Sequence, residues 1–194
     1  MPPKAKITKE MIVDVAFGII QREGVDKVTA RSISQQLNCS TQPVLYHFAT
    51  VEDIKKAVYK KADAYHSDYI MNMENDYGDP MLTMGMNYIN FARKERNIFQ
   101  FLFQSNEFSG ASILDLLEME EILPLLTVLQ QELELSLEEV KEVFSTLFIF
   151  VHGYASLYAN NTMIYEEANV ISAVEKVFEG AICVLKGDQD EKNI

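Results

Sequence analysis

The chain has 194 residues, of which 48% are hydrophobic and 24% are charged, a composition typical of one globular domain or two small ones. With 17 lysine and arginine residues against 29 aspartate and glutamate residues, the net charge is −12, so nucleic acid and anionic membranes would repel the molecule taken as a whole. The charge is divided unevenly, however. Residues 1–66 carry ten basic and seven acidic side chains, a net charge of +3, whereas residues 67–194 carry seven basic and 22 acidic ones, a net charge of −15. This asymmetry predicts a basic head that meets phosphate and an acidic body that does not.

The first predicted elements are two helices. Apolar residues recur at three- and four-residue spacing between Thr8 and Gly24, which predicts a helix over 8–23 that ends at the glycine. Thr29 is a suitable N-cap for a second, shorter helix over 30–37.

A tight turn and a third helix follow. Residues 38–40, Asn-Cys-Ser, suit a turn because Asn tolerates the left-handed backbone and Ser is a good N-cap. We expect the third helix to start at Thr41, with Pro43 in its first turn, where the missing N–H costs little.

Longer helices make up the rest of the chain. Thr50 and Asp53 resemble a capping box that opens a fourth helix reaching toward Asn75. The further ranges predicted to be helical are 80–96, 98–104, 112–132 with a kink at Pro124, 137–160 and 167–186, the last closed by Gly187.

Two short helices joined by a three-residue turn and braced by a longer helix form the helix-turn-helix arrangement. A helix that enters the major groove needs hydrogen-bonding side chains at its N-terminal end and an apolar back face. The first requirement is met by Ser40, Thr41 and Gln42, and the second by Val44, Leu45 and Phe48.

Residues 29–48, TARSISQQLNCSTQPVLYHF, resemble the DNA-binding domain of the TetR/AcrR repressors, and the likeness covers about residues 8–58. The resemblance implies an all-α homodimer with an N-terminal three-helix DNA-binding domain at residues 1–50. Behind it, residues 51–194 are expected to form a helical effector-binding and dimerisation domain. The residues expected to contact DNA are Lys6, Thr29, Arg31, Ser40, Thr41, Gln42, Pro43, Tyr46, His47 and Lys55.

Within that set, Ser40 to Pro43 are expected to face bases, and Tyr46, His47 and Lys55 to lie near phosphates. Two positions depart from the family pattern: Leu45 stands where most relatives carry a phosphate-contacting tyrosine, and Val51 where a lysine is frequent. Backbone amides at the start of the fourth helix are expected to offer phosphate another contact. The alternative for Tyr46 is a place in the core.

The acidic body is rich in Met, Phe and Tyr between residues 81 and 165, and such side chains line adaptable apolar pockets. Core packing is the alternative for each of them. The residues expected to bind a small apolar or amphipathic effector are Met84, Tyr88, Phe91, Phe103, Phe108, Met119, Phe148 and His152. Apolar stripes on the last two helices predict a dimer interface that includes Leu147, Val151, Tyr154, Val174, Val177 and Phe178.

Two other classes of function are weighed against a repressor that reads a palindromic operator. An enzyme is disfavoured because Asp63 and His66 form a single imperfect copy of the paired Glu-x-x-His element of di-metal bundles, so no metal, cofactor or catalytic residue is predicted. A protein–protein module that has lost DNA affinity is the second alternative. Two distant cysteines and an amino terminus without an apolar core favour the cytoplasm, and polar residues in the uncharged run between Glu142 and Glu166 favour a bundle helix over a membrane span.

Overall fold

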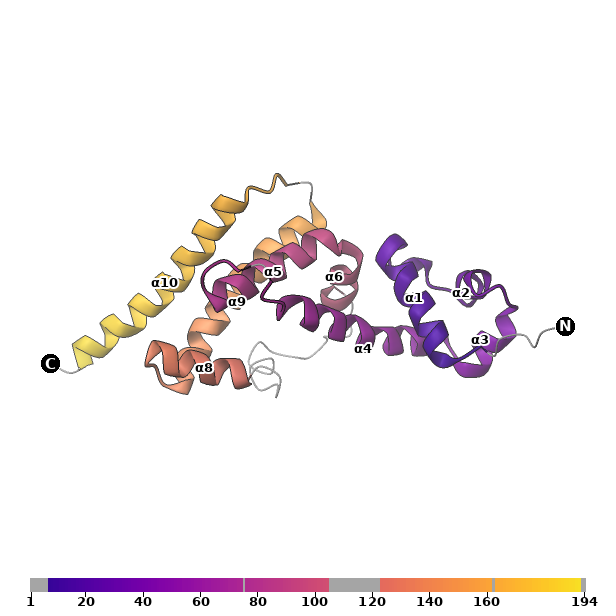
Figure 1. Ribbon diagram of the computed structural model, residues 1–194, viewed down its shortest axis with the longest axis horizontal. Helices are drawn as coiled ribbons and strands as arrows, with labels where there is room; N and C mark the ends of the chain where they lie inside the picture. Colours follow the sequence, from indigo (N-terminus) through magenta and orange to yellow (C-terminus); the bar gives the residue numbers. More distant parts are fainter. Residues whose placement is uncertain (1–6, 75, 105–122, 162, 193–194) are drawn as a thin grey trace. The chain divides into compact units, whose positions relative to one another are not determined.

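A computed structural model describes residues 7–74, 76–104, 123–161 and 163–192 (Figure 1). Over these residues the regular secondary structure consists of α-helices and one short 3-10 turn, and no strand is present. The predicted all-α class is therefore confirmed. The part of the expected 112–132 helix that precedes residue 123 lies outside the described residues.

By its internal contacts the chain divides into two compact units. Unit 1 comprises Met1–Met71 and Phe91–Glu107, and unit 2 comprises Asn72–Asn90 and Phe108–Ile194. Unit 1 runs past residue 50 because α4 packs on α1, and α6 packs on both of these helices. The functional division into residues 1–50 and 51–194 stays a prediction.

Unit 1 is built around α1, whose buried residues recur at helical spacing. Ile12, Ala16 and Ile19 are fully or almost fully buried, so one stripe of the helix faces the core. The helices of this unit are α1 (Lys9–Glu23), the 3-10 turn η1 (Val25–Lys27), α2 (Ala30–Gln36), α3 (Thr41–His47), α4 (Val51–Ile70) and α6 (Arg96–Phe103).

Aromatic rings fill the part of unit 1 where α4 and α6 meet. The imidazole of His66 is buried, and its ring centroid lies 4.9 Å from that of Phe91 and 5.0 Å from that of Phe103. Asp63, by contrast, is exposed. His66 thus lies in the core and Asp63 on the surface, so the two residues of the imperfect metal motif differ in burial.

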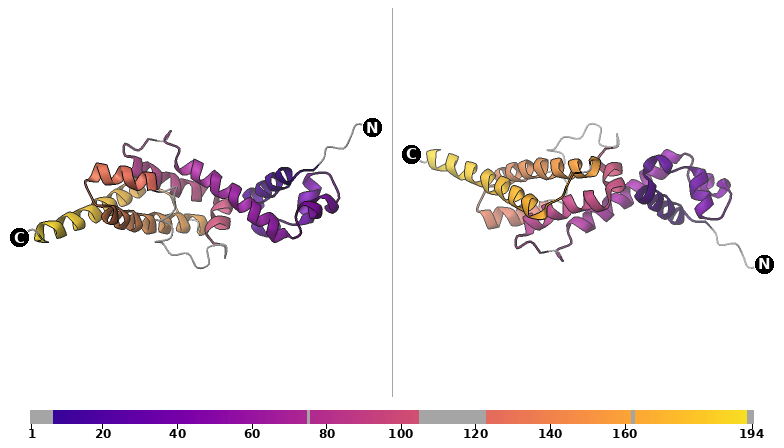
Figure 2. Two further views of the ribbon diagram at one scale, coloured as in Figure 1. Left: turned by 90° about the horizontal axis from the view of Figure 1, so that it is seen from below. Right: turned by 90° about the horizontal axis from the view of Figure 1, so that it is seen from above.

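Unit 2 consists of the first part of α5 (Pro80–Lys94) together with α8 (Leu123–Leu133), α9 (Leu137–Asn160) and α10 (Glu167–Lys192). Nearly every residue from Met81 to Asn90 is buried, so this stretch of α5 is covered on all sides. In both views of Figure 2 the C-terminal turns of α10 extend past the ends of α8 and α9.

Two predicted helix ends are wrong. The helix expected to close at Gly187 continues to Lys192, because a glycine ends a helix when it adopts the left-handed conformation and is tolerated when it does not. The fourth helix ends at Ile70, five residues before Asn75, and its C-cap Met71 donates its backbone N–H to the Ser67 carbonyl.

Candidate nucleic-acid interface

The helix before the candidate interface is fixed at its N-terminus by a capping box. Thr29 Oγ1 accepts the backbone N–H of Ser32 at 3.0 Å, and Ser32 Oγ accepts that of Thr29 at 2.9 Å. The reciprocal bonds satisfy two donors that a helix start leaves open. The N-cap predicted at Thr29 is confirmed, and Ser32 completes a capping box that was not predicted.

A left-handed residue makes the turn between α2 and α3 possible. Asn38 has a φ of 51°, as predicted from its tolerance of that region, and the backbone N–H of Cys39 donates to the Ser34 carbonyl at 3.0 Å. Ser40 occupies the N-cap position of α3 but makes no side-chain cap hydrogen bond. Its exposed hydroxyl is therefore not used to hold the start of α3.

The short helix α3 has a buried side and an exposed side. Val44 is completely buried and Phe48, just after the helix, is nearly so, which places both in the core as predicted. Thr41 and Gln42 are exposed. α2 packs against α3, so the exposed side is held on a supported helix.

The prediction for Leu45 is wrong. It was expected on the apolar back face with Val44 and Phe48, yet 50% of its surface is exposed. The reason is helical geometry: position 45 is four residues after exposed Thr41, and residues four apart share a face.

Tyr46 lies on the surface, with 84% of the residue exposed, which excludes the alternative that it belongs to the core. Its ring meets that of His47 edge-on with centroids 5.3 Å apart. His47 is half-buried, and its Nε2 donates to the Ile7 carbonyl at 2.9 Å, which ties the end of α3 to the segment before α1. His47 is thus engaged within the protein, whereas Tyr46 is available to a partner.

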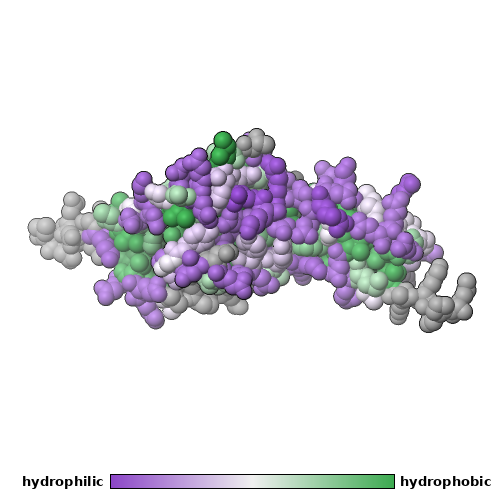
Figure 3. All heavy atoms as spheres, turned by 45° about the horizontal axis from the view of Figure 1, so that its top comes forward, coloured by the Kyte–Doolittle hydropathy of each residue, from purple (hydrophilic) through white to green (hydrophobic). Residues whose placement is uncertain are grey.

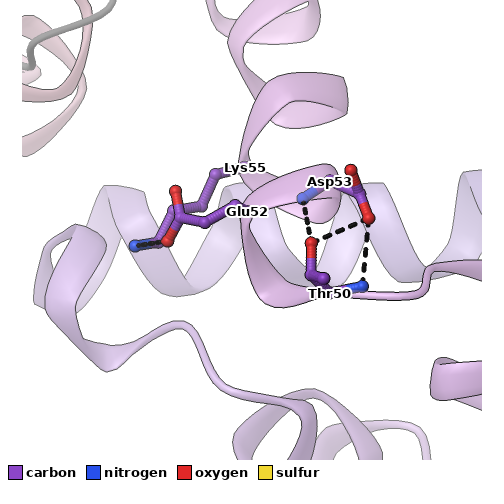
Figure 4. A network of polar contacts seen from close by, with 4 residues as sticks. All are labelled: Thr50, Glu52, Asp53 and Lys55. Carbon is purple, nitrogen blue, oxygen red and sulfur yellow. Dashed lines mark hydrogen bonds and ion pairs between the residues drawn. The ribbon is translucent and has the colours of Figure 1, made fainter.

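The N-terminus of α4 is occupied by side chains of the protein itself (Figure 4). Thr50 Oγ1 accepts the backbone N–H of Asp53 at 3.1 Å, and Asp53 Oδ2 accepts both the backbone N–H and the hydroxyl of Thr50, at 3.0 and 2.7 Å. The predicted capping box is confirmed. It also uses amides that we expected to be open to phosphate, and it adds a negative charge there.

The ammonium group of Lys55 forms an ion pair with Glu52 Oε1 at 2.8 Å, one turn away on α4 (Figure 4). A phosphate at this point has to compete with that carboxylate. Ion pairs at a protein surface contribute about 0–1 kcal/mol, so Glu52 competes only weakly with a phosphate for Lys55. The three-residue spacing of Glu52 and Lys55 is a signal for this pair that the sequence analysis did not use.

The other residues predicted to contact DNA differ in exposure. Thr29 and Arg31 are exposed near the start of α2, and Pro43 is half-buried in the first turn of α3. Lys6 lies outside the described residues.

A polar cluster that the sequence analysis missed joins three helices of unit 1. The Glu95 carboxylate, between α5 and α6, accepts hydrogen bonds from Gln21 Nε2 of α1 and from the Tyr65 hydroxyl of α4, both at 2.9 Å. Burial, followed by the hydrogen bond and charge of Glu95, raises the pKa of Tyr65 to about 12. Asn97 Nδ2 adds a bond of 3.0 Å to the Gln21 carbonyl. The sequence gives no local sign of this cluster because its members are 30 and 74 residues apart.

Part of the predicted effector set comes together in unit 2. The Tyr88 hydroxyl lies 2.8 Å from His152 Nδ1, and the Phe148 ring lies 5.9 and 5.7 Å from those of Tyr88 and His152, between centroids. Burial lowers the pKa of His152 and raises that of Tyr88, so both groups are neutral at pH 7.

The remaining members of that set are elsewhere. Met84 lies one turn before Tyr88 on α5 and is partly exposed. Phe91 and Phe103 pack against His66 in unit 1. Phe108 and Met119 lie outside the described residues. The predicted set is therefore divided between the two units.

The predicted dimer residues are likewise divided by burial. Leu147, Val151 and Val174 are buried within unit 2, and Gly85 of α5 lies against the last two of them. Tyr154, Val177 and Phe178 keep exposed surface. Figure 3 shows hydrophobic surface near the C-terminal end of α10, where Val184 is exposed. On α9 the exposed residues also include Leu157, which belongs to the apolar stripe predicted for the interface, and Ile149, which was not predicted there.

Two features of the described residues bear on a metal-dependent or membrane-spanning role. No group of three histidine, cysteine, aspartate or glutamate side chains gathers there in a way that suits a metal ion. None of the helices in the same part of the chain has the length and apolar character needed to cross a membrane.

No protein-family model and no curated protein matches the chain. The likeness of residues 8–58 to the TetR/AcrR repressors therefore rests on the pattern of residues alone.

Proposed function

We propose that the protein is a DNA-binding transcriptional regulator that uses α2 and α3 as a helix-turn-helix, binds a palindromic operator as a homodimer, and is released by a small apolar or amphipathic effector. One observation carries the DNA-binding part. On α3, the hydrogen-bonding side chains of Thr41 and Gln42 are exposed, while Val44 directly behind them is completely buried. A helix that reads base edges in the major groove needs this combination of an open polar face and an anchored back.

The structure of α3 matches this role at both ends. Its start follows a turn made by left-handed Asn38, and its end is held by the bond from His47 to the segment before α1. A reading helix fixed in this way loses little conformational freedom when it binds. The net charge of +3 on residues 1–66 favours phosphate as the surrounding partner.

The homodimer is supported by the partly exposed apolar residues of the last two helices. Tyr154 on α9 and Val177, Phe178 and Val184 on α10 expose apolar surface to solvent in a single chain. Pairing of two copies would bury it. Sedimentation equilibrium of the full chain is expected to give the mass of two chains, and a mass of one chain would contradict this part of the proposal.

The effector is supported by Tyr88, Phe148 and His152. A hydrogen-bonded polar pair beside aromatic rings is the lining that amphipathic small molecules favour. Core packing alone also accounts for these contacts. The test is therefore whether a small molecule that binds this cluster lowers the affinity of the protein for operator DNA.

A second candidate, a protein–protein module, is favoured by one set of observations. Lys55 is paired with Glu52, the α4 amides are capped by Asp53, and Leu45 and Tyr46 present apolar surface. The two candidates differ in salt dependence, because contacts with several phosphates release counterions and impose a steep slope.

The experiment is a selection of bound duplexes from a random DNA pool with the full chain. We expect an inverted repeat among the selected sequences, with an affinity that falls steeply as salt is raised. Gln42→Glu, which places a negative charge on the exposed face of α3, is expected to abolish the enrichment. Gln131→Glu makes the same change at an exposed position of α8 and serves as the matched control. Flat, negligible DNA binding by the wild-type chain would favour the module instead.

A further inference from the structure

We propose that Leu45 determines part of the operator sequence by contacting the methyl group of a thymine in the major groove. This inference rests on the proposed function and adds to it a specificity-determining residue and the base that it selects.

Leu45 lies on the exposed side of α3. Successive residues of an α-helix are about 100° apart around its axis, so Thr41, Leu45, Gln42 and Tyr46 follow one another within an arc of about 140°. All four are exposed, whereas Val44, on the opposite side, is completely buried. Leu45 therefore lies inside the exposed arc, between Thr41 and Gln42.

The exposed arc combines hydrogen-bonding side chains with an aliphatic one. Thr41 and Gln42 carry groups that donate and accept hydrogen bonds, as base edges require. Leu45 has no polar group, yet half of its surface is open. A single exposed leucine is ordinary on a protein surface, but this one stands between the side chains proposed to face bases.

One base offers an apolar group to such a side chain in the major groove. Every other group that distinguishes base pairs in the major groove is a hydrogen-bond donor or acceptor, while thymine adds a methyl group. An aliphatic side chain in the reading arc makes no hydrogen bond at any base, and it gains apolar contact area at the methyl group of thymine. We therefore expect a thymine at one fixed position of each half-site.

Replacing thymidine with deoxyuridine tests this inference, because the exchange removes the methyl group and keeps the base pair. In duplexes carrying the selected operator, thymidines are replaced one position at a time and the affinity of the full chain is measured. We expect one position in each half-site at which the exchange weakens binding about fourfold, the effect of one buried methyl group. The Leu45→Ala variant is expected to bind the thymidine and deoxyuridine duplexes equally.

A matched control separates contact with DNA from a general effect of truncation. Met71 is 55% exposed at the end of α4, so Met71→Ala removes a comparable apolar side chain away from α3. This variant is expected to keep the fourfold discrimination. Circular dichroism of Leu45→Ala is expected to match that of the wild type, since the side chain is not part of the core.

The outcomes distinguish this inference from the proposed function. A selected operator whose affinity is unchanged by deoxyuridine at every position, or a Leu45→Ala variant that still discriminates, would overturn the role of Leu45 and leave DNA binding intact. Failure of the full chain to enrich any sequence would overturn both. Enrichment with a methyl effect that depends on Leu45 supports both.

Discussion

Two helices of the molecule differ in burial: most of α3 in unit 1 keeps exposed surface, whereas the first part of α5 in unit 2 is almost completely buried. In α3 a single residue, Val44, is fully buried, and the exposed positions include the large side chains of Leu45 and Tyr46. In α5, ten consecutive residues from Met81 to Asn90 are buried apart from partly exposed Met84. Substitutions in α5 are therefore expected to change stability, and substitutions on the open face of α3 to change recognition.

The largest effect is expected from a cavity in α5. Met86 is completely buried, so Met86→Ala should lower the free energy of unfolding by about 2–5 kcal/mol through lost contacts and the space left behind. Chemical denaturation measures this. Met71→Ala, at an exposed position, is the control and should change stability by less than about 0.5 kcal/mol. Equal losses for the two variants would contradict the burial assigned to α5.

The next largest effect is expected at Arg31, a basic residue of unit 1. We expect it to contribute to DNA binding and not to stability. Arg31 is exposed near the start of α2, and Arg31→Met should weaken operator binding roughly tenfold and reduce the slope of log K against log salt by about 1, the contribution of one phosphate contact. Fluorescence anisotropy at several salt concentrations gives both values.

Lys94→Met removes a positive charge from an exposed position of α5 and is the control. The same slope for Arg31→Met and the wild type would show that Arg31 makes no phosphate contact.

A smaller effect on stability is expected at Thr50 and Ser40, the N-cap residues of α4 and α3. Thr50 accepts the Asp53 N–H, so Thr50→Ala should cost about 1 kcal/mol of unfolding free energy. Ser40→Ala should cost less than about 0.5 kcal/mol, because the Ser40 side chain makes no cap hydrogen bond, yet it should weaken operator binding. If Ser40→Ala proved the more destabilising of the two, the assignment of Ser40 to recognition rather than capping would be wrong.

The smallest effect is a pH dependence in unit 2. Burial lowers the pKa of His152 below its unfolded value near 6.5, so the unfolded chain binds a proton there more readily than the folded one. The stability that comes from the neutral ring is present above pH 6.5 and is lost as the pH falls below that value. Thermal unfolding of His152→Gln should show a smaller drop between pH 7.5 and 5.5 than the wild type, since glutamine forms hydrogen bonds but does not titrate. An unchanged drop would contradict the role given to His152.

Local signals in the sequence predicted most of the helices. The caps at Thr29 and Thr50 and the left-handed Asn38 depend on residues within three positions, so their chemistry can be read from the sequence. Glycine was a poorer guide: Gly24 ends α1 with a φ of 90°, whereas α10 runs through Gly187. Whether a glycine adopts the left-handed region depends on its surroundings, which periodicity does not report.

The site was predicted less completely because exposure depends on packing. Leu45 was predicted on the apolar back face of α3 from its apolar character, and the structure exposes it because it shares a face of the helix with exposed Thr41. The bonds from Glu95 to Gln21 and Tyr65 join residues 74 and 30 positions apart and leave no local pattern. The predicted effector residues are divided between the two units because their positions along the chain do not show which of them pack together.

The central claim is that the open face of α3 reads base pairs, and a comparison of selected operators tests it most directly. Selections from one random duplex pool are made with the wild-type chain and with Gln42→Ala, whose exposed position leaves the fold intact. We expect the wild type to yield an inverted repeat and the variant to lose its base preference at one position of each half-site while keeping the others. The same consensus from both chains would contradict the claim that α3 reads DNA.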